Sequence, residues 1–195
     1  MKKKLFRVFF TLILLINNAV ALEPDIFVQS TVNRASKLLA EDISKEEKIE
    51  KLKIIARDTV DIEGIGLYTL GSARKNLNDT DKKKYSDLFE KYFLKSFSSR
   101  LAEYTNPEID VIGKEMLNKN YTIVNSILKA TNERPEIKID WRIYTKDPEK
   151  PLIRDLIIEG LSLARTQKEE FASVLSSNDG DINALFKTLE EFSNN

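Results

Sequence analysis

The 195-residue chain contains no histidine and no cysteine. A Ser-His-Asp triad, a Cys-His nucleophile pair and a cysteine-rich zinc site all need one of these residues, so the sequence excludes them. Disulfide bonds are excluded for the same reason. Any catalysis would depend on carboxylates, Lys, Tyr, Ser or Thr side chains. We therefore expect no cofactor and no resident metal.

Long apolar runs are also scarce, and the clearest one lies at the N-terminus. Residues 8–16 are apolar except for Thr11, follow Lys2, Lys3, Lys4 and Arg7, and precede the small residues 19–21, which read Ala-Val-Ala. A basic segment, a short apolar segment and an Ala-x-Ala site are typical of a secretory signal peptide. A membrane-spanning helix needs about 20 apolar residues. The sequence thus predicts a signal peptide over residues 1–21 and a single mature domain over 22–195.

The balance of 31 basic and 31 acidic residues changes if the signal peptide is removed. That segment carries four basic residues and no acidic one, so the mature chain would be mildly acidic. Such a chain has no overall attraction to nucleic acid or to anionic lipid. We expect a soluble periplasmic protein with no nucleic-acid partner and only transient membrane contact.

Apolar residues at helical spacing predict about six helices in the mature chain. The first begins at Pro24, the second at a Ser44 cap, the third at an Asp61 cap, and the fourth at residues 78–81. The fourth carries an aromatic stripe and should end at Asn106-Pro107. The last two follow Gly160 and residues 179–181. Glycines 64 and 66 within the third helix predict a close approach of its backbone to another group.

The pattern changes to a period of two after residue 108, which predicts strands over residues 109–112, 121–130, 136–145 and 152–159. Alternation is clearest in the third, where Ile137, Ile139, Trp141 and Ile143 share one face. The turns between the strands are short enough for hairpins. The predicted fold is α+β, with helices packed on one face of a four-stranded antiparallel sheet.

Carboxylates are almost the only acid–base groups available. Asp58, Asp61 and Glu63 cluster at a helix junction, and we interpret them mainly as caps and partners of arginine. Asp155 and Glu159 are too far apart along one strand for a two-carboxylate glycosidase. We interpret them as groups that hold the end of the strand and the turn after it.

One motif is more specific than these patterns. Residues 155–163 read Asp-Leu-Ile-Ile-Glu-Gly-Leu-Ser-Leu, with Thr166-Gln167 and Glu170-Phe171 after them. This segment resembles the strand-to-helix transition of the MlaC family, Asp-x-x-(Val/Ala)-Glu-Gly-Val-Ser-(Met/Leu). The Trp141-Arg142 pair on the preceding strand is similar to a Trp-Arg pair of that family.

The helices support the same resemblance over residues 48–192. Residues 55–66 with Leu70-Gly71 are similar to the family's Asp-aromatic-x-x-(Ala/Gly) helix, and residues 78–93 resemble its Thr-Pro-x-Gln helix. Ile62 stands where that family commonly has an aromatic residue, and Asp79 replaces the usual proline.

The resemblance implies a fold, a function and partners. The fold would be a nuclear-transport-factor-like cone of helices around a sheet, with an apolar cavity for phospholipid acyl chains. The function would be that of a periplasmic carrier, linked to organic-solvent tolerance and outer-membrane lipid asymmetry. The partners would be diacyl phospholipid, an inner-membrane complex of MCE-domain protein and ABC transporter, and an outer-membrane lipoprotein–porin complex.

We expect the cavity to be lined by inward strand residues and by apolar residues of the third and fourth helices, each of which could instead belong to the filled core. The expected lining residues are Ile62, Ile65, Leu70, Phe89, Phe93, Phe97, Ile139, Trp141, Ile143, Leu156, Ile158 and Leu161. The sequence does not decide which face of the fourth strand points inward, because Ile153 and Ile157 alternate with Leu156 and Ile158.

Two alternatives of other classes stay open at this point. One is a periplasmic enzyme on the same fold that uses Asp58, Asp61, Glu63 or Tyr68 as its acid or base. The other is an adapter that binds only a protein partner. An apolar cavity would disfavour the first, and the lack of a cavity would favour the second.

Overall fold

The computed structural model describes residues 22–132 and 134–194, so the predicted signal peptide lies outside the described residues. Within them, no helix is long and apolar enough to cross a membrane. The elements are α1 (Pro24–Leu39), α2 (Lys45–Thr59), α3 (Ile62–Thr69), the 3₁₀ helix η1 (Ala73–Lys75), α4 (Asp79–Leu101), β1 (Ile109–Asn118), β2 (Tyr121–Leu128), β3 (Ile137–Tyr144), β4 (Leu152–Ile158), β5 (Leu161–Ser162), α5 (Leu163–Ser176) and α6 (Ile182–Asn194).

Polar caps begin three helices at the predicted residues. The hydroxyl of Ser44 accepts from the backbone N–H of Glu47 at 3.1 Å, and the carboxylate of Asp61 accepts from the N–H of Gly64 at 2.8 Å. The side chain of Asn78 caps α4 in the same way. These bonds satisfy backbone donors that have no partner inside the helix.

The end of α4 comes earlier than the sequence predicted. The helix stops at Leu101, and the N–H of Tyr104 then bonds to the carbonyl of Leu101 at 3.1 Å. This turn packs Tyr104 against the small apolar cluster around Leu38 and Leu52. Tertiary packing therefore ends the helix before the proline at position 107 would require it.

The sheet is an antiparallel meander in the order β1-β2-β3-β4-β5, which confirms the α+β prediction. Two details differ from it. The fifth strand has only two residues and pairs with the end of β4, so it is too short for a periodic pattern to show. Strand β1 continues to Asn118, because a register shift between Val111 and Gly113 interrupts the period-two pattern where the sequence predicted an end.

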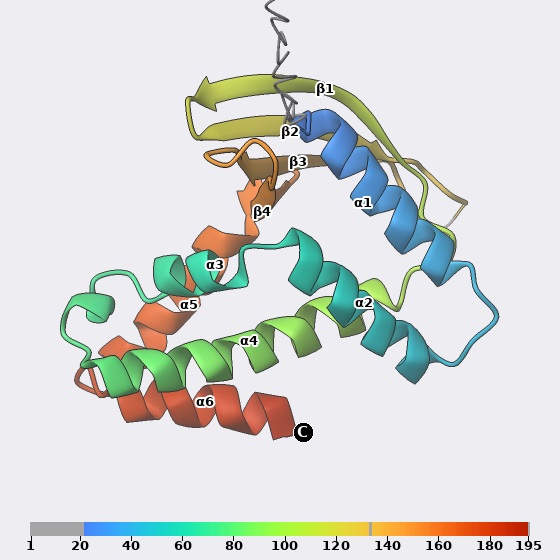
Figure 1. Ribbon diagram of the computed structural model, residues 1–195. Coiled ribbons are helices and arrows are strands. Elements are labelled where there is room, and N and C mark those ends of the chain that lie inside the picture. The colour runs from blue at the N-terminus through green and yellow to red at the C-terminus, as the bar shows by residue number, and fades with distance from the viewer. Residues whose placement is uncertain (1–21, 133, 195) are drawn as a thin grey trace, which may run out of the picture.

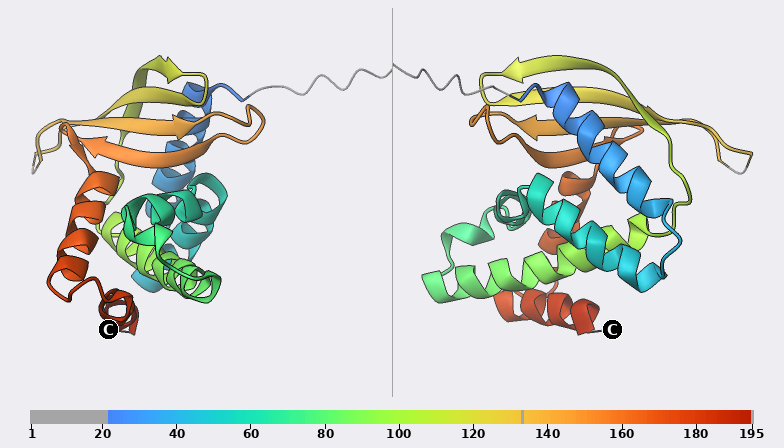
Figure 2. Two further views of the ribbon diagram at one scale, coloured as in Figure 1. Left: turned by 90° about the vertical axis from the view of Figure 1, so that its left-hand side faces the viewer. Right: turned by 45° about the vertical axis from the view of Figure 1, so that its right-hand side comes forward.

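Figure 1 shows the helices gathered on one side of the curved sheet. Helix α1 lies along the β1 side, α3 and α4 lie beneath the sheet, and α6 packs against α4 in the layer farthest from it. Helix α5 descends from the end of the sheet to join α6. In both views of Figure 2, the opposite face of the sheet carries no helix of the described chain. The helices therefore cover only one face of the sheet.

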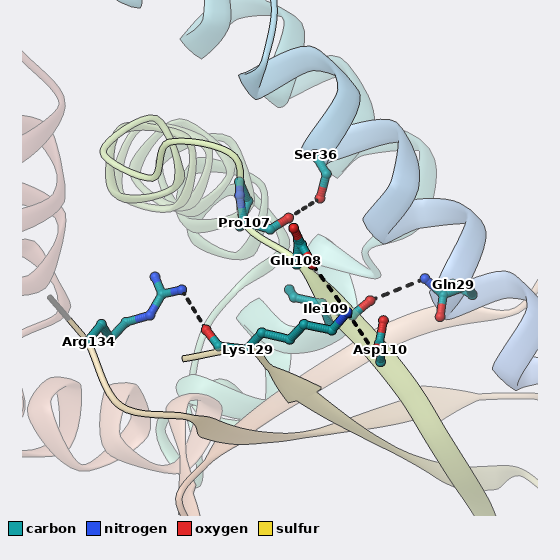
Figure 3. Close-up of polar contacts among 8 residues, drawn as sticks. All are labelled: Gln29, Ser36, Pro107, Glu108, Ile109, Asp110, Lys129 and Arg134. Atoms are coloured by element: carbon teal, nitrogen blue, oxygen red, sulfur yellow. Dashed lines mark hydrogen bonds and ion pairs between the residues drawn. The ribbon is translucent and has the colours of Figure 1, made fainter. Parts of the chain in front are cut away.

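Helix α1 protects the free edge of β1. The side-chain amide of Gln29 donates to the carbonyl of Ile109 at 3.3 Å (Figure 3). The same amide accepts from the N–H of Val111 at 3.0 Å, so it acts as a short pairing partner for the strand. Two turns later, the hydroxyl of Ser36 donates to the carbonyl of Pro107 at 2.8 Å. Unpaired edge groups favour aggregation, and these contacts remove part of that risk.

An ion-pair cluster fixes the start of α1 to β1. The Lys114 ammonium contacts the carboxylate of Glu23 and lies 2.7 Å from that of Asp25. Its hydrogen bond lowers the pKa of Asp25 below the usual value, and the two carboxylates raise the pKa of Lys114. The stabilisation by Asp25 is therefore present above about pH 4 and is lost as the pH falls through its lowered pKa.

We predict that Lys114→Met lowers the urea midpoint of unfolding slightly at neutral pH and low salt. The groups are solvent-exposed, so the effect should shrink in 1 M NaCl. The difference from the wild-type chain should also shrink as the pH falls through the lowered pKa of Asp25, because the protonated carboxyl no longer pairs with Lys114. A difference that is unchanged by acid and by salt would show that Lys114 acts through packing of its alkyl chain instead.

The inward face of the sheet follows the predicted alternation in β3. Ile139, Trp141 and Ile143 are buried, whereas the residues between them are half-buried on the opposite face. The face of β4, which the sequence left open, is decided by a bulge at Arg154. Ile153 is paired with Ile143 and Leu156 with Trp141, so both face inward although they are three positions apart.

The two glycines of α3 make the close approaches that the sequence predicted. A Cβ at Gly66 would lie 2.9 Å from the Phe89 ring, and a Cβ at Gly64 would lie 2.4 Å from the Arg154 guanidinium. Gly66 thus lets α3 pack directly on the aromatic side of α4. Gly64 makes room for Arg154, which pairs with Asp61.

Candidate functional site

A cavity of about 350 Å³ lies between the inward face of the sheet and helices α4 and α5. Its lining residues are Val60, Ile65, Phe89, Tyr92, Phe93, Ser96, Phe97, Arg100, Trp141, Ile153, Asp155, Leu156, Leu163, Ala164, Thr166, Gln167, Glu170 and Phe192. They come from seven parts of the chain, namely α3, α4, β3, β4 and α5, together with Val60 after α2 and Phe192 on α6. Only the folded chain brings them together.

Burial divides this lining into a floor and a rim. The floor is buried and mostly apolar, and consists of Val60, Ile65, Phe89, Trp141, Ile153, Asp155 and Ala164. The rim is solvent-exposed and consists of Arg100, Leu163, Glu170 and Phe192. The cavity is therefore mostly apolar inside and meets water at Arg100, Leu163, Glu170 and Phe192.

Aromatic side chains of α4 form one wall. Phe89, Phe93 and Phe97 follow one another at intervals of four residues and so share one helix face. The Phe93 and Phe97 rings are stacked, with centroids 5.4 Å apart. Phe171 of α5 supports Phe89 from behind in an edge-to-face contact at 6.2 Å. The wall is held by other aromatic rings, which leaves its inner surface free to contact a ligand.

The polar groups of the wall are hydrogen-bonded. The Tyr92 hydroxyl donates to Oε1 of Gln167 at 2.6 Å, and Nε2 of Gln167 donates to Oε2 of Glu170 at 2.9 Å. Burial is the main cause that raises the pKa of Tyr92 above its usual value. This hydroxyl is therefore neutral at physiological pH and acts as a hydrogen-bond donor, not as a base.

Asp155 is the one carboxylate in the floor, and both of its oxygens are occupied. Oδ2 accepts from the Ser162 hydroxyl at 2.6 Å, and Oδ1 accepts from the N–H of Ala164 at 3.0 Å. The N–H belongs to the first turn of α5, where a negative charge is favourable. The structure thus confirms that Asp155 holds the end of β4 and the start of α5. Glu159 holds the neighbouring turn by accepting from the N–H of Lys138.

We predict that Asp155→Asn lowers the free energy of unfolding by about 1–3 kcal/mol, because an amide cannot accept both hydrogen bonds of this buried carboxylate. Chemical denaturation measures the loss. The matched control is Asp140→Asn, whose carboxylate accepts from Asn125 at 2.8 Å in a half-buried position and should cost less than about 1 kcal/mol. Equal losses would contradict a special role for Asp155.

Six of the twelve expected lining residues do line the cavity: Ile65, Phe89, Phe93, Phe97, Trp141 and Leu156. The other six do not. Ile62, Leu70, Ile139 and Ile143 are buried in the core, where neighbouring helices and strands fill the space around them. Ile158 is half-buried at the end of β4, and Leu161 on β5 is 59% exposed.

Several lining residues were missed by sequence analysis. Tyr92 belongs to the aromatic stripe of α4 and could have been included on that basis. Val60 lies beside Ile153 in a parallel bridge, which no local pattern signals. Phe192 reaches the rim from the last helix, where its ring lies 4.8 Å from that of Tyr92.

The acid–base candidates of the enzyme alternative do not line the cavity. Asp58 pairs with Arg34 at 2.9 Å on the surface. Asp61 caps α3 and pairs with Arg154. Tyr68 lines a second cleft of about 350 Å³ beside the β1–β2 turn, which shares Ile65, Asp155 and Ala164 with the cavity. Within residues 22–132 and 134–194, no group of three or more acidic side chains could hold a metal ion.

Comparisons with known proteins fit this architecture. Comparison with curated protein sequences found no significant match. A solved structure of the phospholipid-binding protein from Ralstonia solanacearum, in complex with a phospholipid, is similar with a TM-score of 0.74 at 18% sequence identity. The match covers 88% of this chain and 97% of that one, and at this identity it shows the shared fold. Residues 29–191 match the MlaC protein family, which is most of the chain, and the protein therefore belongs to that family.

Proposed function

We propose that this chain is a periplasmic phospholipid carrier that holds acyl chains in the cavity between the sheet and α4. The observation that carries the proposal is an apolar, largely buried floor with an open rim. Membership of the MlaC family and the phospholipid bound to the similar Ralstonia protein support it.

The energetics of lipid transfer favour such a cavity. Moving one methylene from an apolar environment into water costs about 0.8 kcal/mol, so a chain of about 15 methylenes costs on the order of 12 kcal/mol. Free diffusion of phospholipid across an aqueous compartment is therefore negligible. A carrier needs only to replace the bilayer with an apolar cavity of similar quality, and it needs no nucleophile, metal or cofactor.

The size of the cavity is suited to most of one acyl chain. A volume of about 350 Å³ holds on the order of a dozen methylene-sized groups, if each takes about 30 Å³ as a water molecule does in the liquid. A diacyl lipid then requires α4 and α5 to separate further, or leaves part of the second chain along Leu163 and Phe192 at the rim. Both of these side chains are apolar and exposed.

The proposed partners follow from the transport role. The carrier would receive or deliver phospholipid at an outer-membrane lipoprotein–porin complex and at an inner-membrane complex of MCE-domain protein and ABC transporter. The predicted signal peptide would export it to the periplasm, with the mature chain beginning at Leu22. Intact mass of the protein from the periplasmic fraction tests that cleavage.

Lipid binding is tested by native mass spectrometry of the mature chain purified from a host with membranes, together with uptake from phospholipid vesicles. We expect an added mass that corresponds to a bound phospholipid with one or two acyl chains. The fraction of protein that carries lipid should rise after incubation with vesicles. A chain that carries no phospholipid and takes up none would overturn the proposal. Transfer of labelled lipid to vesicles that contain each membrane complex then tests the shuttle between them.

The two alternatives are less well supported. For an enzyme, the floor offers Asp155 alone as an acid–base group, and both of its oxygens already accept hydrogen bonds. An adapter that binds only proteins does not need an apolar cavity with an aromatic wall. The carrier accounts for the cavity, its wall and its open rim together.

A further inference from the structure

Two opposite charges lie at the rim of the cavity. Arg100 is in the last turn of α4 and Glu170 is on α5, and both are exposed and line the cavity. In the described part of the chain, neither side chain forms an ion pair, whereas Arg34, Arg57 and Arg154 each pair with a carboxylate within 3 Å. The rim thus presents a guanidinium, from Arg100, and a carboxylate, from Glu170, that form no ion pair with each other.

Both charged side chains line the cavity on either side of the aromatic wall. Arg100 follows Ser96 by four residues on α4, so these two lining residues share one face of the helix. The pKa of Tyr92 is raised chiefly by burial, but the Glu170 carboxylate raises it further and the Arg100 guanidinium lowers it. The Tyr92 hydroxyl is therefore close enough to sense both groups.

One oxygen of the Glu170 carboxylate is hydrogen-bonded within the chain. The hydrogen bonds from Tyr92 to Gln167 and from Gln167 to Glu170 fix the carboxylate through its Oε2 atom. Among the described residues, Oε1 of Glu170 takes part in no hydrogen bond or ion pair. Lys95, on the same helix as Arg100, already has contacts within the chain. Its ammonium donates to the carbonyl of Ser193 at 3.3 Å and lies 5.7 Å from the centre of the Phe192 ring.

The head group of a lipid whose chains fill the cavity must emerge at this rim. A guanidinium matches the oxygens of a phosphodiester, and a carboxylate matches a primary ammonium. We propose that Arg100 and Glu170 form a head-group site for zwitterionic aminophospholipids, with the phosphodiester on Arg100 and the ammonium on Glu170. This inference rests on the proposed function. A phospholipid that has a phosphodiester but no amine would leave Glu170 unpaired beside a second negative charge.

The test is competitive loading from vesicles of equal phosphatidylethanolamine and phosphatidylglycerol, with bound lipid identified by native mass spectrometry. We expect the wild-type chain to carry three to ten times more phosphatidylethanolamine. Glu170→Gln should bring that ratio close to one by lowering the fraction loaded with phosphatidylethanolamine, because that lipid loses the carboxylate that binds its ammonium. The matched control, Glu169→Gln, changes the exposed neighbour that does not line the cavity, and it should keep the wild-type ratio.

Arg100 is tested with lipids that share acyl chains. Arg100→Gln should speed the loss of both phospholipids to acceptor vesicles about three- to tenfold, while leaving the loss of diacylglycerol unchanged because that lipid has no phosphate. Arg165→Gln, an exposed arginine outside the cavity lining, is the control. Thermal melts of all four variants check that they are folded.

The outcomes separate this inference from the proposed function. A wild-type chain that loads phospholipid with a ratio near one, or an unchanged ratio in Glu170→Gln, would overturn the head-group site and leave the carrier intact. Equal acceleration for phospholipid and diacylglycerol in Arg100→Gln would overturn the phosphodiester contact. Failure of the wild-type chain to take up any of the three lipids would overturn the carrier itself.

Discussion

Ser96→Trp is expected to reduce phospholipid loading at least tenfold while the chain stays folded. Ser96 is a small, half-buried residue of α4 that lines the cavity and lies between Phe93 and Phe97 in the sequence. An indole at this position would enter a space of about 350 Å³ and displace part of an acyl chain. Excluding two or three methylenes costs about 2 kcal/mol, which is more than a tenfold change in affinity.

The control for Ser96→Trp is Ser86→Trp, which places the same side chain on the exposed face of the same helix. Its loading should equal that of the wild-type chain. Native mass spectrometry after incubation with vesicles measures both variants, and far-ultraviolet circular dichroism checks the fold. Normal loading of Ser96→Trp would show that the lipid does not occupy this cavity.

Phe89→Ala should cause the largest loss of stability of any single change in the aromatic wall, about 3–5 kcal/mol. Phe89 is 2% exposed and packs against the rings of Tyr85 and Phe171 as well as against Gly66. Its removal leaves a hole that these neighbours cannot fill without moving. Urea unfolding of the lipid-free chain measures the loss.

The hole left by Phe89→Ala would open into the cavity, because Phe89 is part of its floor. Saturating phospholipid should therefore raise the midpoint of thermal unfolding more in this variant than in the wild-type chain. Phe192→Ala is the control, since its ring is 41% exposed and should cost roughly 1 kcal/mol. A loss below about 1 kcal/mol for Phe89→Ala would contradict its role as the centre of the wall.

The β4 strand illustrates what a periodic pattern misses. Strict alternation offered a choice between a face with Ile153 and a face with Leu156, and the bulge at Arg154 places both of them inward. The sequence around a bulge contains no reliable signal, because the extra residue is tolerated only where tertiary contacts hold it. Here Arg154 is held by Asp61 and lies over the Tyr144 ring at 4.5 Å.

The lining of the cavity shows the same limit. Phe89, Phe93 and Phe97 were predicted because one helix face carries them, and local periodicity is sufficient for that. Ile62 and Leu70 have the same apolar character as Ile65, but the structure packs them into the core. Whether an apolar side chain meets another side chain or a cavity depends on how far apart the surrounding elements lie, which a single segment does not encode.

The sequence by itself determined the classes of chemistry that are excluded, the order of helices and strands, the caps and the glycines that permit close packing. These features depend on residue identity and on contacts between near neighbours in the chain. Only the tertiary structure decided that Val60 and Phe192 line the cavity and that Arg100 and Glu170 share the rim of the cavity. It also decided that both oxygens of Asp155 accept hydrogen bonds. Those features depend on the distances between segments far apart in the chain, which packing of the whole domain sets.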